Sequence, residues 1–266
     1  MSSVKKMEAQ IDPRAVVSPS ARLGAGVRVG AYAIVGDDVE LGAGCVLHPH
    51  AIVQGPARLG SENVLHPFCS IAGDPQDLKF AEERTMLEAG DRNIFRECVT
   101  ISRGTAQGGG ITRIGSDNLF LAYAHVGHDC VIGSHTLFVN SATLAGHVIV
   151  EDFATVGAFS PVHQFCRIGR YAYIGASTVI TQDVPPFSRV VTERTTQCFG
   201  VNAIGLERRG FPDERIRSLE SAYRLLLRSK LNTTQALEQM RATLNGSADV
   251  AELIAFIESA ERGVTK

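Results

Sequence analysis

Residues 126–150 read VGHDCVIGSHTLFVNSATLAGHVIV, and every sixth position of this stretch is a large apolar residue. The same period extends over two long segments of the chain. Its apolar members stand at positions 11, 17, 23, 29, 35, 41, 47, 53, 59, 65 and 71, and again at every sixth position from 114 to 180. Neither an α-helix nor a flat sheet keeps a period of six, whereas a coil of three short strands does. The sequence therefore predicts a parallel β-helix built from hexapeptide repeats.

The other places of the hexad fit the same architecture. The residue after the apolar one is often glycine, and we expect it to supply the positive φ angles of the corners. The fifth place is small, and four cysteines occupy it, so we expect these to be buried hydrophobes without disulfides or metal. They are Cys45, Cys69, Cys130 and Cys166. Because the chain has no CxxC pair, its cysteines fit a reducing compartment, and we expect a cytoplasmic location.

Composition limits the classes of partner. The 266 residues carry a formal net charge of −2, which gives no general argument for binding nucleic acid or a membrane surface. There is no signal peptide and no long apolar stretch, so we expect no stable membrane insertion. We expect a polar leader at 1–10, a β-helix at 11–186, and a linker with a C-terminal helical domain at 187–266.

Two segments interrupt the repeat. Residues 72–88 carry proline and charged residues, and the period then resumes at Ala89, Phe95 and Ile101. Residues 103–113 form a glycine-rich excursion, after which the phase is reset at Ile114. Long loops on a rigid coil are usually functional. A tolerated surface insertion is the alternative for each loop.

The chain changes character after Pro185 and Pro186. Pro212 precedes apolar residues at helical spacing, and we expect Thr233 and Ser247 to cap further helices near 234–244 and 248–262. Residues 205–230 contain seven basic and four acidic residues, a local balance of +3. This segment is either a solvated helix face or a dock for an acidic partner. The candidate docking residues are Arg215, Arg217, Arg224 and Arg228.

The repeat also predicts which polar residues meet. Three hexads make one turn, so residues 18 apart stack on neighbouring turns, about 4.8 Å apart. His128 then stacks over Gly146, which stacks over Gln164. Asp129 stacks over His147, which stacks over Phe165. His163 adjoins Gln164, and His125 lies one corner before His128. We therefore expect a polar cluster along one edge of three consecutive turns.

Such a cluster has two chemical uses. A neutral imidazole is a general base near pH 7, and it is also a zinc ligand. Asp129 is placed to orient the His128 ring, and the Gly146 N–H to bind an oxyanion. A base with an oxyanion donor suits acyl transfer to a hydroxyl. A zinc enzyme of carbonic-anhydrase type and a non-catalytic binding module are the alternatives.

Several motifs resemble one known family. They are QDLK (76–79), RGTAQGGG (103–110), AHVGHDC (124–130), LAGHV (144–148), VHQFCRIG (162–169), QDVPP (182–186) and GLERRGF (205–211). Over roughly residues 11–262 the chain is similar to the UDP-N-acetylglucosamine O-acyltransferases of lipid A biosynthesis. The resemblance implies a homotrimer of left-handed parallel β-helices with C-terminal helices and with active sites between subunits. It implies no cofactor, because acyl carrier protein is a co-substrate. It also implies no bound metal.

The implied reaction moves a 3-hydroxyacyl chain from acyl carrier protein to the glucosamine 3-position of UDP-N-acetylglucosamine, the first step of lipid A biosynthesis. Whether the acceptor is the ordinary sugar or its 3-amino analogue stays open, as does the acyl chain length. The resemblance makes His128 the general base, assisted by Asp129, and Gly146 the oxyanion donor.

The resemblance also implies a set of substrate-binding residues. The sugar positions are Asp77, His147 and Gln164; Lys79, His125 and His163 lie in matching motifs; Ala176 lines the acyl groove; and Asn202, Arg208 and Arg209 lie on the nucleotide side. Ile204 stands where the family pattern has an acid, so the uridine contacts stay open.

Overall fold

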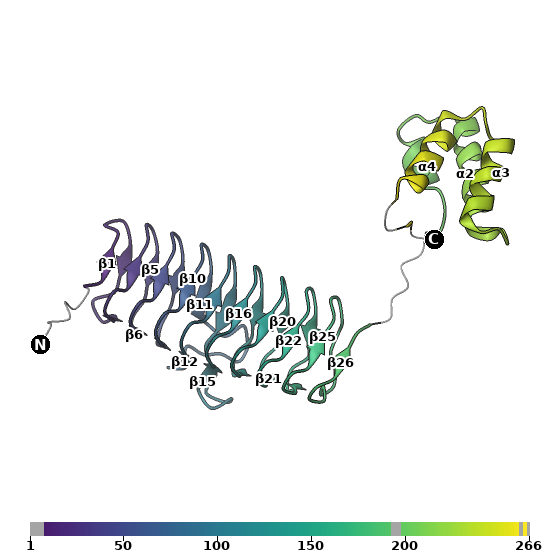
Figure 1. Ribbon diagram of the computed structural model, residues 1–266. Coiled ribbons are helices and arrows are strands. Elements are labelled where there is room, and N and C mark those ends of the chain that lie inside the picture. The colour runs from purple at the N-terminus through teal and green to yellow at the C-terminus, as the bar shows by residue number, and fades with distance from the viewer. Residues whose placement is uncertain (1–7, 193–197, 261–262, 265–266) are drawn as a thin grey trace, which may run out of the picture. The chain divides into compact units, whose positions relative to one another are not determined.

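The computed structural model describes residues 8–192, 198–260 and 263–264. The chain divides into two compact units, Met1–Thr192 and Glu193–Lys266. Figure 1 shows the first unit as short strands that follow one another along a single axis, from β1 to β26. The second unit consists of helices. Residues 1–7 of the expected polar leader lie outside the described residues, and Gln10 already belongs to β1.

The described residues of the first unit form three parallel sheets. Sheet A contains β1 (Gln10–Ile11), β4 (Arg28–Val29), β7 (Val46–Leu47), β10 (Val64–Leu65), β13 (Ile94–Phe95), β16 (Leu119–Phe120), β19 (Leu137–Phe138), β22 (Thr155–Val156), β25 (Tyr173–Ile174) and β26 (Arg189–Val190). Sheet B contains β2 (Val16–Val17), β5 (Ile34–Val35), β8 (Ile52–Val53), β11 (Ser70–Gly73), β14 (Thr100–Ser102), β17 (His125–Val126), β20 (Thr143–Leu144) and β23 (Pro161–Val162). Sheet C contains β3 (Arg22–Leu23), β6 (Val39–Leu41), β9 (Ala57–Leu59), β12 (Met86–Ala89), β15 (Ile111–Ile114), β18 (Val131–Ile132), β21 (Ile149–Val150) and β24 (Arg167–Ile168).

The register follows the sequence period. His125 pairs with Thr143, and Thr143 pairs with Pro161, each 18 residues further along the chain. The sixth-position apolar residues point inward and stack, as the rings of Phe95, Phe120 and Phe138 do at centroid distances of 5.2 and 4.7 Å. Three periods of six residues therefore make one turn of the coil.

Both interruptions of the repeat are loops on this coil. The first loop runs from residue 74 to residue 85, between β11 and β12, and the second from 103 to 110, between β14 and β15. Leu59 pairs with Ala89 and Ala89 with Ile114, so sheet C stays in register across both loops. The pairing of β11 with β14 has a register shift between Ile71 and Gly73, where the first loop begins. The loops thus add side chains beside the coil and leave its wall intact.

The glycines that follow the apolar position do not supply the positive φ angles of the corners, contrary to the prediction from the sequence. Positive φ angles occur instead at other corner residues, such as Asp129 (59°), His147 (62°) and Phe165 (67°). The hexad glycines allow close approach of neighbouring coils, since a Cβ on Gly127 would lie 2.7 Å from the carbonyl carbon of Ala145. The corner residues can therefore carry large side chains, and these stack from coil to coil.

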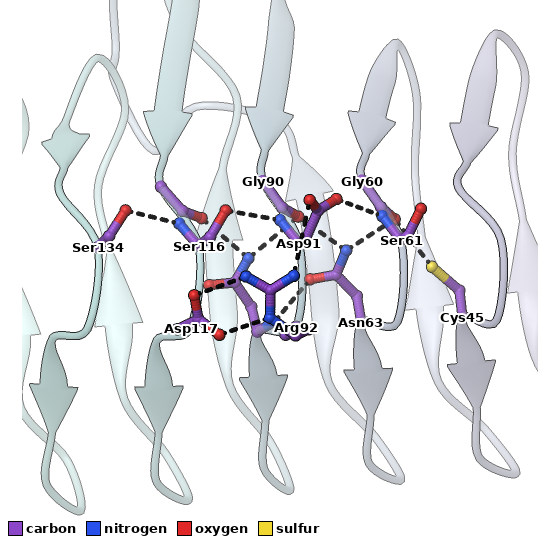
Figure 2. A network of polar contacts seen from close by, with 12 residues as sticks. Cys45, Gly60, Ser61, Asn63, Gly90, Asp91, Arg92, Ser116, Asp117 and Ser134 are labelled. Atoms are coloured by element: carbon purple, nitrogen blue, oxygen red, sulfur yellow. Dashed lines mark hydrogen bonds and ion pairs between the residues drawn. The ribbon is translucent and has the colours of Figure 1, made fainter.

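One corner of the coil is stabilised by a polar ladder (Figure 2). The Asn63 amide group donates to the carbonyl oxygens of Gly60 and Gly90, both at 2.9 Å. Its Oδ1 accepts the Asn93 N–H at 3.0 Å, so this buried amide joins neighbouring coils. Because every buried polar atom of Asn63 has a partner, the amide costs the core little.

The second unit is a small helical domain. It contains α1 (Ala203–Glu207), α2 (Asp213–Arg228), α3 (Thr233–Thr243) and α4 (Ala248–Glu258). Its core includes Ala222, Met240 and Ile254, from α2, α3 and α4. Ser247 caps α4 as expected, but α3 is capped by Asn232 rather than Thr233. Asn232 is the N-cap because Gln235, three residues further along the chain, completes a capping box with it.

The structure adds detail at the expected domain boundary. The sequence placed the end of the coil at residue 186, and in the structure β26 follows that residue and pairs with β25. The first compact unit then extends to Thr192. In the described part of the chain, no helix is both long and apolar enough to cross a membrane.

Candidate active site

A hollow of about 580 Å³ lies on sheet B, over β17, β20 and β23. Strand alternation explains its lining, because His125, Thr143 and Pro161 face outward while their neighbours Val126 and Leu144 are buried. Its walls are Gln76, Ser102, His125, Gly127, His128, Thr143, Leu144, Ala145, Gly146, Pro161, Val162, His163, Gln164, Val179, Ile180 and Thr181. Five of the expected site residues therefore meet here: His125, His128, Gly146, His163 and Gln164.

His128 is held in one orientation by its sequence neighbour. Its Nδ1 lies 2.8 Å from Oδ2 of Asp129, whose side chain is 1% exposed. A carboxylate accepts hydrogen bonds, so in the neutral ring the proton is on Nδ1 and the lone pair is on Nε2. Among the described residues Nε2 has no hydrogen-bond partner, and the ring lines the hollow. This tautomer suits a general base.

Gly146 leaves the space that the His128 ring occupies. A Cβ on Gly146 would lie 2.5 Å from Cε1 of His128 and 2.7 Å from Nε2. The coil above therefore has to present glycine at this point. Within the described part of the chain, the Gly146 N–H donates to no backbone carbonyl, so it is available to a ligand oxygen beside the imidazole.

His147 lies next to this pair on the same corner. Its ring meets that of His128 edge to face, with centroids 5.0 Å apart and planes at 90°. Its Nε2 is 3.7 Å from Asp129 Oδ2. Its other neighbour is Phe165, whose ring stacks on it. His147 is partly exposed and is within reach of a polar group bound near His128.

His125 sits deeper in the wall. Its Nδ1 is 2.8 Å from Oγ1 of Thr100. Burial lowers the pKa of His125, and the nearby His128 lowers it further. His125 is therefore neutral at pH 7 and acts as a hydrogen-bonding group rather than as a charge.

The same cluster has ligand types that zinc accepts. One ligand atom each from His128, Asp129 and His147 lies within 4.8 Å of the others. However, Nδ1 of His128 and Oδ2 of Asp129 share a hydrogen bond, and Thr105 donates to both carboxylate oxygens. A metal would have to displace these bonds, so the cluster fits a proton-transfer dyad better than the zinc alternative.

Asp129 and His147 adjoin the hollow without lining it, and three more of the expected residues of the first unit also lie outside it. Asp77 accepts the backbone N–H of Lys79 at 3.0 Å in the 74–85 loop, and the Lys79 side chain is exposed. Ala176 is exposed two residues after β25, which belongs to sheet A, whereas the hollow lies on sheet B. Their roles in binding the sugar and the acyl chain stay predictions.

The nucleotide-side residues belong to the second unit. Asn202 caps α1, its side chain accepting the Gly205 N–H at 3.2 Å. Arg209 donates to the Gly205 carbonyl at 3.1 Å, and Arg208 is the C-cap of α1. All three are exposed and stay predictions as nucleotide contacts.

The candidate docking arginines divide into two kinds. Arg215 makes a bidentate ion pair with Asp249, at 2.8 and 2.6 Å, and its guanidinium lies over the Phe211 ring. Arg217 is 3.6 Å from Asp213 on the same helix. Arg224 and Arg228 form no ion pair with a described residue, and with Phe199 and Tyr223 they line a second hollow of about 380 Å³. Arg224 and Arg228 are therefore the better candidates for docking.

The 18-residue rule places His147 over Phe165, and the two rings do stack. Three other residues that the structure brings to the hollow or its supports are not predicted from the sequence. Gln76 and Ser102 line the hollow, and Thr105 holds Asp129. These three lie in or beside the two loops, where the repeat gives no position.

Comparisons with known proteins show the family of this chain. A family model described as UDP-N-acetylglucosamine O-acyltransferase, domain 2, matches residues 183–265. The acyl-(acyl-carrier-protein)–UDP-N-acetylglucosamine O-acyltransferase of Alkalilimnicola ehrlichii is 56% identical over 257 residues, covering 97% of this chain and 99% of that protein. The enzyme of the same name from Stenotrophomonas maltophilia is 52% identical and covers 95% and 96%.

A solved structure of LpxA from Acinetobacter baumannii is similar in fold, with a TM-score of 0.68 and 38% identity over 96% of this chain and 99% of that one. The expected left-handed parallel β-helix followed by a small helical part is confirmed. With relatives above 50% identity aligned over nearly its whole length, this chain belongs to the UDP-N-acetylglucosamine O-acyltransferase family.

Proposed function

We propose that this chain transfers a 3-hydroxyacyl group from acyl carrier protein to the glucosamine 3-position of UDP-N-acetylglucosamine, the first step of lipid A biosynthesis. The names of its relatives support the substrates. The observation that carries the mechanism is the His128–Asp129 pair, at 2.8 Å, beside the Gly146 N–H at the wall of the hollow. No cofactor is needed, because the acyl group arrives as an activated thioester.

The reaction follows from this geometry. Nε2 of His128 takes the proton from the acceptor hydroxyl while Asp129 stabilises the resulting imidazolium. The sugar oxygen forms a bond to the thioester carbonyl carbon, and the Gly146 N–H stabilises the oxyanion. Collapse of the intermediate breaks the carbon–sulfur bond, and the imidazolium returns its proton to the carrier thiolate. An amine at the 3-position would be acylated by the same steps.

The remaining assignments complete the proposal. His125, His147, His163 and Gln164 contact the sugar, Asp77 and Lys79 extend that contact, and Ala176 borders the acyl chain. Asn202, Arg208 and Arg209 bind the nucleotide, and the carrier protein docks on the basic face of α2. Because Asp77, Lys79 and Ala176 lie outside the hollow of their own chain, a homotrimer with sites between subunits accounts for them best. A cytoplasmic location stays a prediction from the free cysteines.

The test is an acyl-transfer assay with UDP-N-acetylglucosamine and carrier proteins bearing 3-hydroxyacyl chains of several lengths. His128→Ala is expected to lose at least ~10²-fold in kcat, the usual worth of a positioned base. The matched control is His135→Ala, because His135 also stacks on an aromatic ring at a corner but lies outside the hollow. A wild-type protein inactive with every donor, or a fully active His128→Ala, would refute the proposal.

A further inference from the structure

The glycine-rich loop 103–110 encloses the carboxylate of Asp129. The side chain of Asp129 is 1% exposed, and Thr105 is buried beside it. The Thr105 N–H donates to Oδ1 at 2.8 Å, and the Thr105 hydroxyl donates to Oδ2 at 2.6 Å. One loop residue therefore binds both carboxylate oxygens. Oδ2 is also the oxygen that accepts Nδ1–H of His128.

The direction of the hydroxyl bond is fixed by the loop itself. The Gly108 N–H donates to Oγ1 of Thr105 at 3.1 Å, so the hydroxyl oxygen already accepts a hydrogen bond. Its own hydrogen is then directed to Asp129, which has only acceptors to offer when ionised. The Gly110 N–H closes the turn on the Thr105 carbonyl at 2.7 Å. Thr105 is thus a fixed donor rather than a rotating surface hydroxyl.

The packing of Gly108 against Asp129 is a second, independent sign that the loop holds this carboxylate. A Cβ on Gly108 would overlap the carboxyl group of Asp129. Gly109 and Gly110 also lack side chains, but a Cβ on either would meet nothing within 4 Å. Close approach to Asp129 is therefore the requirement at Gly108 alone. Thr112, just past the loop, accepts the Asp129 N–H at 2.8 Å, so the residue is held at its backbone as well.

We propose that Thr105 is a positioning residue of the acyl transfer, which acts through Asp129 by holding its carboxylate against Nδ1 of His128, and that Gly108 leaves the space this requires. The inference rests on the proposed function of His128 as base. Without the hydroxyl, Oδ2 loses one of its two close donors, and the carboxylate is free to turn away from the imidazole. The charge-assisted bonds involved make the expected loss about ten- to hundredfold in kcat.

The experiment is a double-mutant cycle in the acyl-transfer assay. Thr105→Val is expected to lower kcat by this factor, with the KM for UDP-N-acetylglucosamine unchanged, and Thr105→Ser is expected to restore most of it. In an Asp129→Ala background Thr105→Val should lower kcat no further, because its effect passes through that carboxylate. An equal loss in both backgrounds, or a raised KM at unchanged kcat, would overturn the proposal.

Two further variants separate positioning from folding. Thr136→Val removes a buried hydroxyl that donates to Asn118 at 2.7 Å on another corner, so it should lower the melting temperature and leave kcat intact. Gly108→Ala keeps the Thr105 donor and should lower kcat by displacing the Asp129 carboxylate. This variant tests the proposal even if Thr105→Val does not fold. Full kcat in Gly108→Ala would overturn the proposal. If His128→Ala were itself fully active, the proposed function would have failed instead.

Discussion

The imidazole of His147 lies flat on the ring of Phe165, with centroids 4.6 Å apart and planes 13° from parallel. Both residues have positive φ at the same corner of successive coils, and the stack aims Nε2 of His147 toward Asp129. Phe165 is itself 65% exposed, so its ring contributes more to orienting His147 than to the core.

Phe165→Ala is therefore expected to impair the site without unfolding the coil. Aromatic pairs contribute about 0.5–1.5 kcal/mol, so we expect roughly a two- to tenfold loss in kcat/KM for UDP-N-acetylglucosamine. Phe153→Ala is the matched control, because Phe153 stacks on His135 at 4.8 Å on another corner. Steady-state kinetics of the two variants test this prediction. An equal loss of kcat/KM in both would mean that Phe165 has no special role in the site.

Gly146→Ala should cost at least ~10²-fold in kcat, because the new methyl group occupies the place of the His128 ring and displaces the base. Gly36→Ala is the control, since its methyl would be 3.4 Å from the nearest atoms. Both variants should keep the circular dichroism of the wild type. Retention of full activity in Gly146→Ala would show that the ring does not need its observed position.

Reversing the charges of Arg224 and Arg228 should raise the KM for acyl carrier protein and weaken its salt dependence. The KM for the UDP-sugar should stay unchanged, because carrier proteins of this kind are acidic and the sugar site is formed elsewhere. Arg241→Glu reverses a charge on α3, where Arg241 pairs with Glu258, and serves as the control. Equal weakening of both substrates would contradict docking on α2.

Arg215→Ala is expected to behave differently from those two arginines. Its guanidinium bridges α2 to Asp249 at the first turn of α4 and covers Phe211. We therefore expect a lower melting temperature of the helical unit, measured by calorimetry, and a KM for the carrier protein that is close to normal. A large rise in that KM in a protein of unchanged stability would make Arg215 a docking residue after all.

Native-state alkylation should distinguish the six cysteines. Burial raises the pKa of the Cys69 and Cys130 thiols to about 12, and it also raises the pKa of Cys45 and Cys166. The thiolate is the reactive form, so at pH 8 these four remain thiols and react slowly. Cys98 and Cys198 are partly exposed and should be labelled first by iodoacetamide, as read by mass spectrometry. Early labelling of Cys130 would mean that the coil opens at the site.

Ala176→Met tests the acyl groove. Each buried CH₂ contributes about 0.8 kcal/mol, so blocking three or four of them should shift the preferred donor to a shorter chain by roughly two orders of magnitude in kcat/KM. Activity on the shorter donor should remain. An unchanged order of preference across donors would place the end of the groove at another residue.

The sequence predicted the parts of the site that belong to the repeat. The 18-residue rule placed His128 over Gly146, and it placed Asp129 over His147, and the structure has both. Thr105 and Gly108 could not be found in this way, because they lie in a loop of eight residues whose path depends on the turn it forms. The role of Ala176 in the acyl groove stays a prediction, because the period of one chain does not show which of its exposed residues contact another subunit.

In the helical unit, two adjacent residues are both suited to cap α3. Asn232 and Thr233 are both good N-cap residues, and a single residue separates them. The choice follows from the reciprocal bonds of Gln235, at 2.9 and 3.1 Å, which Thr233 could not share in the same register. A pattern of residue types alone does not rank such neighbours.

The regular spacing of the coils restricts how this gene can change in length. Because a residue returns to the same corner only after 18 positions, one inserted residue between Asp129 and His147 would rotate every later side chain out of its place. A duplication of a whole coil beyond either end of the site would instead extend the protein and leave the catalytic corner untouched. Length variation among descendants of this chain should therefore come in steps of 18 residues within the wall. Steps of other sizes should occur only in the parts of the two loops that lie away from Gln76, Thr105 and Gly108.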